Sequence, residues 1–268
     1  MFHQHIQYSE NREPNQLNKT LAREMKQARN IQMKLLNATK PIIKSGEITG
    51  VSIPARLVGG DYFDFIELPN GHIRIVIGDV MGKGIPAAML MILTRGVFRS
   101  SVEHFFSPSE TLKAMNEFMF QDLRTLGSFV TLLCADYDPV NHTLTYASAG
   151  HNLPIVITKN KVRKDIPFIN GIMIGGLATS TYKQFTIDLL DEDIVFFYTD
   201  GITDTLNEHG EAFKMERLVE LLERNCQLQS DQIEKAVLKR IGEFTNGELQ
   251  KDDITLIILK VKEELDCE

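Results

Sequence analysis

The sequence predicts an α+β fold in which antiparallel β-sheets are covered by helices, and two observations support it. Apolar, β-branched runs are joined by short turns, so strands that follow one another in the chain are expected to pair as hairpins. The helical segments are gathered in pairs and do not alternate with the strands one by one. This order favours antiparallel sheets over a repeated β-α-β unit.

Length and composition describe an ordinary globular protein. The chain has 268 residues, of which 43% are hydrophobic and 24% are charged. Its net charge of -7 argues against nucleic acid as the main partner. The sequence contains no apolar run of about eighteen residues and no secretory signal, so we expect a cytoplasmic protein that does not enter a membrane. Cys134, Cys226 and Cys267 lie far apart, which fits a reducing compartment and gives no zinc motif.

The chain is expected to consist of an N-terminal extension, residues 1–45, and one domain, residues 46–268. The first 15 or so residues are polar and are predicted to lack regular structure. A helix is predicted from Asn15 to Ala38. Its thin apolar stripe repeats every seven residues, at Leu21, Ala28 and Leu35. Two interpretations stay open: a surface helix packed on the domain, or a short coiled-coil or partner-binding helix.

The first part of the domain is predicted to contain strands followed by two helices. Residues 46–80 hold three apolar runs, and the turn Pro69-Asn70-Gly71 predicts a hairpin because Asn-Gly tolerates positive φ angles. A helix is expected from Ile85 to about Ser101. A second is expected after Ser107, where Ser-Pro-Ser-Glu matches a capping box.

The second part is predicted to return to strands, with one more helical pair before the last of them. The strand-like runs are FVTLLCADYD, TLTYASAG, LPIVIT, FTIDLL, DIVFFYTD and ITLIILKV. The helical runs are MERLVELLERN and SDQIEKAVLKRIGEFT, with Ser230 as the expected N-cap of the latter.

Aspartates stand at the ends of four of the apolar strand runs. They are Asp61, Asp79, Asp200, and Asp252 with its neighbour Asp253. One such residue commonly just begins a turn, but carboxylates that converge raise one another's pKa unless cations lie between them. A set of hard oxygen ligands, without Cys and without an obvious His, favours Mg²⁺ or Mn²⁺ over zinc.

Strand geometry separates the two aspartates of GGDYFDF. Asp61 and Asp64 point to opposite faces of a regular strand, so only one of them is expected at a given ion, and Asp61 is favoured. Glycines before Asp61 and after Asp79 permit close backbone approach, and the carbonyl of Val80 is a further oxygen ligand candidate.

Six motifs occur in order along the chain: GGDYFDF, GDVMGKGIPAAMLM, TLLCADYD, YASAGHNLP, YTDGITDTLNEHGEAF and KDDITLIIL. Together they resemble the PPM (protein phosphatase 2C-like) superfamily, specifically the bacterial SpoIIE/RsbU-type serine phosphatases, over roughly residues 46–262. The resemblance implies a four-layer αββα sandwich of two antiparallel sheets flanked by helices, with a metal site at one edge.

The resemblance also implies roles for the acidic residues. Asp61, Asp79, Asp200 and Asp252 would be the catalytic metal ligands, with Val80 adding its carbonyl and Asp253 as the neighbouring alternative to Asp252. Asp79 would bridge two divalent cations, Mn²⁺ or Mg²⁺. Cations about 4 Å apart can share a water molecule, lower its pKa and align it against the phosphorus.

The predicted activity is hydrolysis of phosphoserine or phosphothreonine on a small regulatory protein. The resemblance implies an anti-sigma-factor antagonist as substrate, in a partner-switching pathway of stress response or sporulation. An activating protein, or a second copy bound through the N-terminal helix, is the expected regulatory partner. Residues 15–40 and 85–101 are expected to communicate with the metal site.

Two other functional classes stay open. One is a catalytically silent PPM-fold scaffold or partner-binding regulator, which the intact acids disfavour. The other is a metal-dependent nuclease, which the net charge and the absence of a basic patch disfavour. Lys83 is expected to be a solvated loop residue, and His151 a buried or turn-capping histidine rather than a proton donor.

Overall fold

The computed structural model of the protein describes residues 14–36, 40–102 and 107–263. The N-terminal segment that is predicted to lack regular structure lies almost wholly outside these ranges, as does Cys267. Ten strands and five helices follow one another in the described residues.

The strands form two antiparallel sheets of five strands each. The first sheet contains, in spatial order, β1 (Gly46–Ile53), β10 (Ile254–Val261), β9 (Ile194–Tyr198), β6 (Ile155–Ile157) and β7 (Arg163–Lys164). The second sheet contains β2 (Tyr62–Glu67), β3 (Ile73–Val80), β4 (Val130–Asp138), β5 (Thr143–Ala149) and β8 (Gln184–Asp188).

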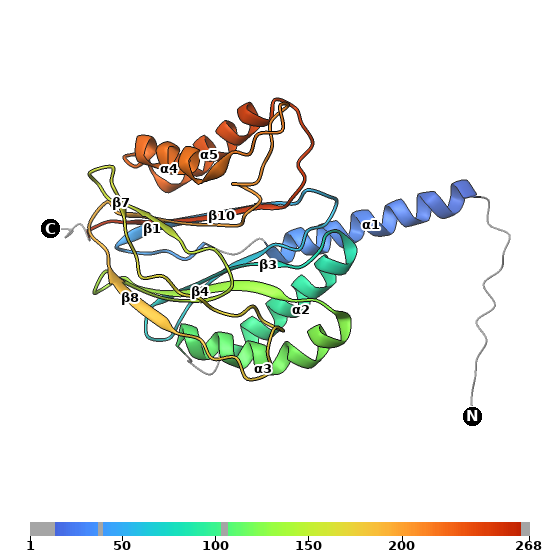
Figure 1. Cartoon of the computed structure of the whole chain (residues 1–268), viewed down its shortest axis with the longest axis horizontal. Coiled ribbons are helices and arrows are strands. Elements are labelled where there is room, and N and C mark those ends of the chain that lie inside the picture. The colour runs from blue at the N-terminus through green and yellow to red at the C-terminus, as the bar shows by residue number, and fades with distance from the viewer. Residues whose placement is uncertain (1–13, 37–39, 103–106, 264–268) are drawn as a thin grey trace.

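Helices cover the outer face of each sheet. The helices are α1 (Pro14–Leu36), α2 (Ile85–Val102), α3 (Pro108–Leu126), α4 (Lys214–Asn225) and α5 (Ser230–Thr245). Figure 1 shows α4 and α5 over the first sheet and α2 and α3 over the second. The predicted four-layer αββα sandwich is therefore confirmed.

Three apolar clusters hold the four layers together. The central cluster lies between the sheets and includes Ile75, Leu133, Phe197 and Ile257. A second cluster joins α2 and α3 to their sheet, and a third joins α4 and α5 to theirs. Both faces of the inner strands are covered, so strands such as β10 are buried along their whole length and read as continuous apolar runs in the sequence.

Local signals in the sequence set several element boundaries. The β2–β3 hairpin turns at Gly71, whose φ of 83° suits a residue without a Cβ. The capping box at the start of α3 is present, since the Ser107 N–H donates to the Glu110 carboxylate at 2.9 Å. The expected N-cap of α5 is wrong by one residue: Gln229 caps the helix, and Ser230, buried, is its first residue.

The N-terminal helix packs on the domain at one of its ends. Its C-terminal end lies against the domain, where Gln32 and Leu36 are buried. Its N-terminal half extends away from the body of the molecule, as Figure 1 shows, and leaves Leu17 and Leu21 more than half exposed. The interpretation as a helix packed on the domain therefore holds for the C-terminal end, and partner binding by the other end stays a prediction.

Helix α2 is, among the described residues, the one segment long and apolar enough to cross a membrane. In the fold it packs against β3 and α3, with Met91 and Phe98 fully buried. An ion pair from Arg99 to the buried Asp64, 2.7 Å between Nε and Oδ2, ties it to β2. Its apolar character is therefore explained by its place in the second core cluster.

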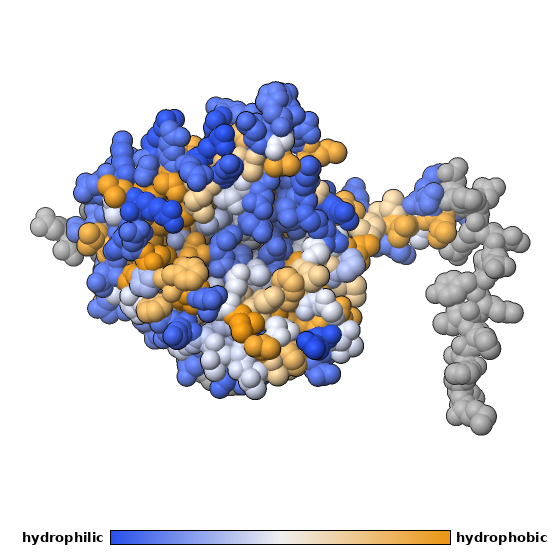
Figure 2. Space-filling model, viewed as in Figure 1, coloured by the Kyte–Doolittle hydropathy of each residue, from blue (hydrophilic) through white to orange (hydrophobic). Residues whose placement is uncertain are grey.

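Some apolar side chains of the α2–α3 layer nevertheless remain at the surface. Figure 2 shows apolar residues gathered in the lower part of this view, where α2 and α3 lie. They include Met89, Phe118 and Leu126, each more than 60% exposed.

Candidate metal centre

The strand-terminal aspartates meet at one end of the sandwich. Asp61 stands just before β2 and Asp79 near the end of β3, and the pairing of Tyr62 with Gly78 sets these two acids side by side. Asp200 follows β9 and Asp252 precedes β10, which is the neighbouring strand of the other sheet. The fold thus brings acids from both sheets to a single edge.

Burial and mutual repulsion act on the ionisation of these acids. The pKa of Asp61, which is only 2% exposed, is raised by burial and then by the charge of Asp79. Burial, followed by the charges of Asp200 and Asp252, raises the pKa of Asp79 to about 7. The pKa of Asp200 is raised by burial and by Asp252. The centre therefore resists accumulating negative charge without a compensating cation.

The carboxylates lie at the same edge but are not packed around a single point. Within the described part of the chain, no three Asp, Glu, His or Cys side chains are grouped tightly enough to enclose an ion as they lie. The Asp61 carboxylate is instead held by the Thr199 hydroxyl, which donates to Oδ2 at 2.9 Å.

Adjacent acids at the start of β10 have different surroundings. The Asp253 carboxylate accepts the backbone N–H groups of Ala55 and Gly60, each at 2.7 Å. A Cβ at Gly59 would lie 2.4 Å from Oδ2 of Asp253, so only glycine permits this approach. Asp253 thus fixes the loop before Asp61. Its neighbour Asp252 has no such backbone contacts on its Oδ2 and faces the centre.

Lys83 is an exposed loop residue, as its sequence context predicts, and its ammonium group also makes two contacts that the sequence does not show. Its Nζ lies 2.7 Å from Oδ2 of Asp252 and donates to the Lys251 carbonyl at 2.6 Å. The physical reason is the excess of carboxylates at this edge, which attracts the nearest ammonium group. Lys83 therefore supplies a positive charge at the position where Asp252 would meet a cation.

The remaining predicted ligand atoms can also be located. The carbonyl oxygen of Val80 lies beside the residue before Asp61, since a Cβ at Gly60 would come within 3.1 Å of it. Asp64 points to the other face, toward α2, where it accepts hydrogen bonds from Arg99 and Tyr62. The alternation argument that favoured Asp61 over Asp64 agrees with this geometry.

His151 is a buried histidine, as its sequence context predicts. Its Nδ1 lies 2.9 Å from the Thr131 hydroxyl, and Thr131 pairs with Asp79 across β3 and β4. Burial lowers the pKa of His151 to about 4, so the ring is neutral at pH 7. It therefore ties the loop after β5 to β4, the strand that pairs with the Asp79-bearing strand β3, and it is not charged for proton donation.

Two residues of this edge were missed by the sequence reasoning. Thr199 orients Asp61, and its only signal is its position directly before Asp200. Gln32 of α1 donates to the Gly59 carbonyl at 2.8 Å and accepts the Gly59 N–H at 3.0 Å. The signal for Gln32 is weak, because a glutamine is common on any polar helix.

The donor set fits a pair of hard divalent cations. Every candidate ligand atom is a carboxylate or carbonyl oxygen, which is the chemistry that Mg²⁺ and Mn²⁺ prefer. The Lys83 ammonium on Asp252 is a second sign that the edge accepts positive charge.

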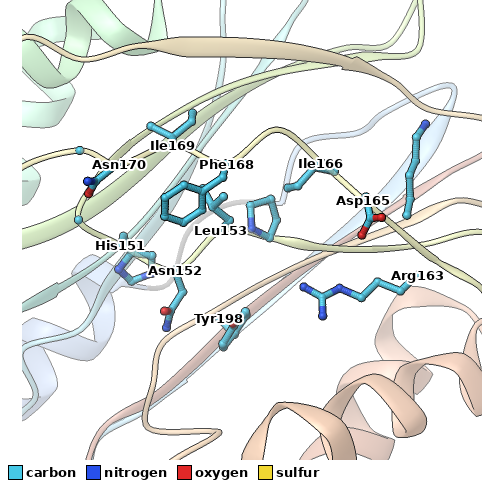
Figure 3. Close-up of a pocket in the computed structure, with 14 residues that line it drawn as sticks. His151, Asn152, Leu153, Arg163, Asp165, Ile166, Phe168, Ile169, Asn170 and Tyr198 are labelled. Carbon is cyan, nitrogen blue, oxygen red and sulfur yellow. The ribbon is translucent and has the colours of Figure 1, made fainter.

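A polar cavity of about 430 Å³ opens beside this centre. Figure 3 shows His151 and Asn152 on one side of it and Arg163 on the other, with Tyr198 below and Phe168 above. Tyr198 lines the cavity, ends β9 and precedes Asp200 by two positions, so the end of β9 connects the cavity to the acidic edge.

Comparisons with known proteins give consistent matches. The family model described as Stage II sporulation protein E (SpoIIE) matches residues 69–262. The phosphoserine phosphatase RsbU of Bacillus subtilis is 30% identical over 95% of this chain and 75% of its own length. Protein IcfG of Synechocystis is 30% identical over 87% of this chain and 41% of its own length.

Solved structures show the same fold. The SiaA-PP2C domain of Pseudomonas aeruginosa aligns with a TM-score of 0.78 at 20% identity, over 92% of this chain and 99% of that one. A SpoIIE structure from Bacillus subtilis, which holds the PP2C phosphatase domain and a regulatory fragment, aligns with a TM-score of 0.66 at 18% identity. That alignment covers 83% of this chain and 64% of the SpoIIE chain.

Asp79→Asn is expected to stabilise the metal-free protein, and more so at higher pH. Because the pKa of Asp79 is about 7 in the fold and near 3.8 otherwise, the folded state binds the extra proton. Its ionisation therefore removes stability as the pH rises from about 4 to about 7. Urea unfolding in EDTA should show a gain of about 1–3 kcal/mol at pH 8 and little gain at pH 4. Glu117→Gln, an exposed charge loss on α3, is the control, and an equal gain at both pH values would contradict the expectation.

Asp252→Ala and Asp253→Ala are expected to differ in stability although the residues are neighbours. Asp253→Ala leaves the N–H groups of Ala55 and Gly60 without their acceptor and should cost about 2–3 kcal/mol. Asp252→Ala removes a partly exposed pair with Lys83 and should change the unfolding free energy by less than about 1 kcal/mol. Similar losses in both variants would show that Asp253 does not fix the loop.

Proposed function

The chain belongs to the SpoIIE family of PPM-type protein serine phosphatases, and we propose that it hydrolyses phosphoserine or phosphothreonine on a small regulatory protein with two divalent cations. One observation carries the cation proposal: aspartates from both sheets meet at one edge, where burial and their mutual repulsion raise the pKa values of Asp61 and Asp79. Residues 46–268 would form the phosphatase domain, with 1–45 as its regulatory extension.

Five residues are proposed as ligands. Asp61, Asp79 and the Val80 carbonyl would hold one cation, and Asp79, Asp200 and Asp252 the other. Asp253 is left out, because both of its carboxylate oxygens accept backbone N–H groups. When bound, Mn²⁺ or Mg²⁺ would lower the pKa of a water molecule and neutralise charge on the phosphoryl oxygens.

The side chains around these ligands have supporting roles. The Thr199 hydroxyl holds the Asp61 carboxylate, and the loop bound by Asp253 fixes the backbone on which Asp61 stands. Lys83 would leave Asp252 when a cation binds there, which frees its ammonium group to approach the phosphate.

A cysteine nucleophile is disfavoured. Both cysteines among the described residues, Cys134 and Cys226, are buried, and burial raises the pKa of Cys134 to about 12. A thiol of that kind stays protonated and cannot attack phosphorus. The scaffold alternative is weakened because every proposed side-chain ligand is an intact carboxylate, and the nuclease alternative by the net charge of -7.

The proposed substrate is a phosphorylated anti-sigma-factor antagonist in a partner-switching pathway. The support is the likeness to the phosphoserine phosphatase RsbU over 95% of this chain. A cytoplasmic location follows from that substrate class.

We also propose α1 as the regulatory element, for an activating protein or a second copy of the chain. Its exposed half carries Leu17 and Leu21, and its buried end reaches the centre through Gln32 and Gly59. The Arg95 Nε of α2 donates to the Leu35 carbonyl at 3.1 Å, which links the two helices expected to communicate with the site.

Asp200→Ala is expected to abolish metal-dependent phosphatase activity. With Mn²⁺, the wild-type protein should release phosphate from a phosphoserine protein and from p-nitrophenyl phosphate. The variant should lose at least about 100-fold in kcat/KM, since even residues behind metal ligands cost 10–100-fold. EDTA should stop the wild-type reaction and added Mn²⁺ restore it. Asp122→Ala, on the exposed face of α3, is the control. Undiminished turnover in Asp200→Ala would contradict the proposed metal-dependent phosphatase function.

Gln32→Ala is expected to weaken cation binding although Gln32 is not a proposed ligand. The variant loses two hydrogen bonds to Gly59 and so loosens the backbone before Asp61. Calorimetric titration with Mn²⁺ should show an affinity about 3- to 10-fold lower, which is less than for residues that contact a ligand directly, because Gln32 acts on Asp61 only through the backbone of Gly59. Gln27→Ala, on the exposed side of α1, should bind like the wild type. Equal affinities in a folded Gln32→Ala protein would remove α1 from the control of the site.

A further inference from the structure

The cavity beside the acidic edge is connected to β9, which leads to Asp200, and to β4, which pairs with the strand of Asp79. On one wall, His151 bonds to Thr131, the residue paired with Asp79. On another, Tyr198 ends β9 and stands two positions before Asp200. The cavity therefore adjoins the edge at which the phosphate is proposed to bind.

Several polar side chains around the cavity are available to form hydrogen bonds with a bound peptide. Among the residues that the structure describes, the Arg163 guanidinium and the Asn152 and Asn170 amides make no hydrogen bond or ion pair with the chain, and all three residues are exposed. Figure 3 shows Asn152 and Asn170 on one side of the cavity and Arg163 on the other. The amides can bond to a peptide backbone, and the guanidinium matches the two oxygens of a carboxylate.

The other charged groups of the same segment leave Arg163 as the available cation. The Lys164 ammonium donates to the Asp188 carbonyl at 2.6 Å. Asp165, two positions after Arg163, forms no ion pair with it. The rim also carries Phe168, which is 78% exposed and offers an apolar face to a bound chain.

From this arrangement we propose that the cavity is a specificity pocket for the protein substrate, in which Arg163 binds an acidic side chain that flanks the phosphoserine. The inference rests on the proposed phosphatase function and adds a recognition element to it. The cations of the centre would be taken up by its aspartates and by the phosphoryl group, so an acidic flank needs a cationic wall of its own, set to one side of the centre. Arg163 supplies that wall, and Asn152 and Asn170 hold the backbone between the flank and the phosphoserine.

The test compares two phosphoserine peptides that are identical except for glutamate or alanine at the flanking positions. In Mn²⁺, the wild-type protein should show a kcat/KM about 10-fold higher or more for the glutamate peptide, the lower end of the range for a hydrogen bond to a charged group. Arg163→Ala should remove this preference, mostly through KM, and keep the wild-type rate on p-nitrophenyl phosphate. Arg163→Glu should prefer a third peptide that has lysine at those positions. Arg124→Ala, an exposed arginine on α3, is the matched control.

Binding gives a second readout that does not depend on turnover. Fluorescence anisotropy with the labelled glutamate peptide should show the same loss of affinity in Arg163→Ala. A wild-type protein without glutamate preference, or a preference that survives in Arg163→Ala, would overturn the pocket assignment. A wild-type protein that hydrolyses no phosphoester in Mn²⁺ would contradict the proposed phosphatase function instead, and the anisotropy result would still decide the role of Arg163.

Discussion

Repulsion between carboxylates gathered at one edge of two sheets is the constraint on which the rest of the structure depends. Asp61 and Asp79 are held there by strand pairing, and Asp200 and Asp252 arrive from the other sheet. Such a group is stable only if protons, an ammonium group or metal ions compensate its charge. The raised pKa values and the contact with Lys83 are two of these forms of compensation, and the proposed binding of cations would be the third.

The surrounding fold keeps these acids from moving apart. The strands that carry them are buried on both faces, so their ends are fixed by the apolar clusters above and below each sheet. Finer control comes from polar contacts: Asp253 binds the loop before Asp61, and Gln32 binds the same loop from α1. One short loop therefore connects the proposed ligand Asp61 with Asp253, which precedes a strand of the first sheet, and with α1, the proposed regulatory helix.

Much of this architecture could be predicted from the sequence because its signals are local. Hairpin turns such as the one at Gly71, and apolar runs such as β10, identify strands, and the motifs identify the family fold. The position of acids at strand ends could also be read directly. The boundary at Ser230 was wrong by one residue, since side chains of several kinds can cap a helix.

What the sequence could not supply are contacts between distant segments. Lys83 is the exposed loop residue that the sequence predicts, but nothing near it in the chain shows that its ammonium group lies 2.7 Å from Asp252. The different surroundings of Asp252 and Asp253 depend on backbone groups almost two hundred positions away. The short strand β7 and the cavity beside it follow from how a loop folds over an edge strand, which no periodic pattern encodes.

The most direct test of a shared two-cation centre is an anomalous-scattering map of crystals soaked in Mn²⁺. Two peaks are expected, one against Asp61 and Asp79 and the other against Asp200 and Asp252, with the Lys83 ammonium moved away from Asp252. A map without density between these carboxylates, in crystals that bind Mn²⁺ elsewhere or not at all, would contradict it.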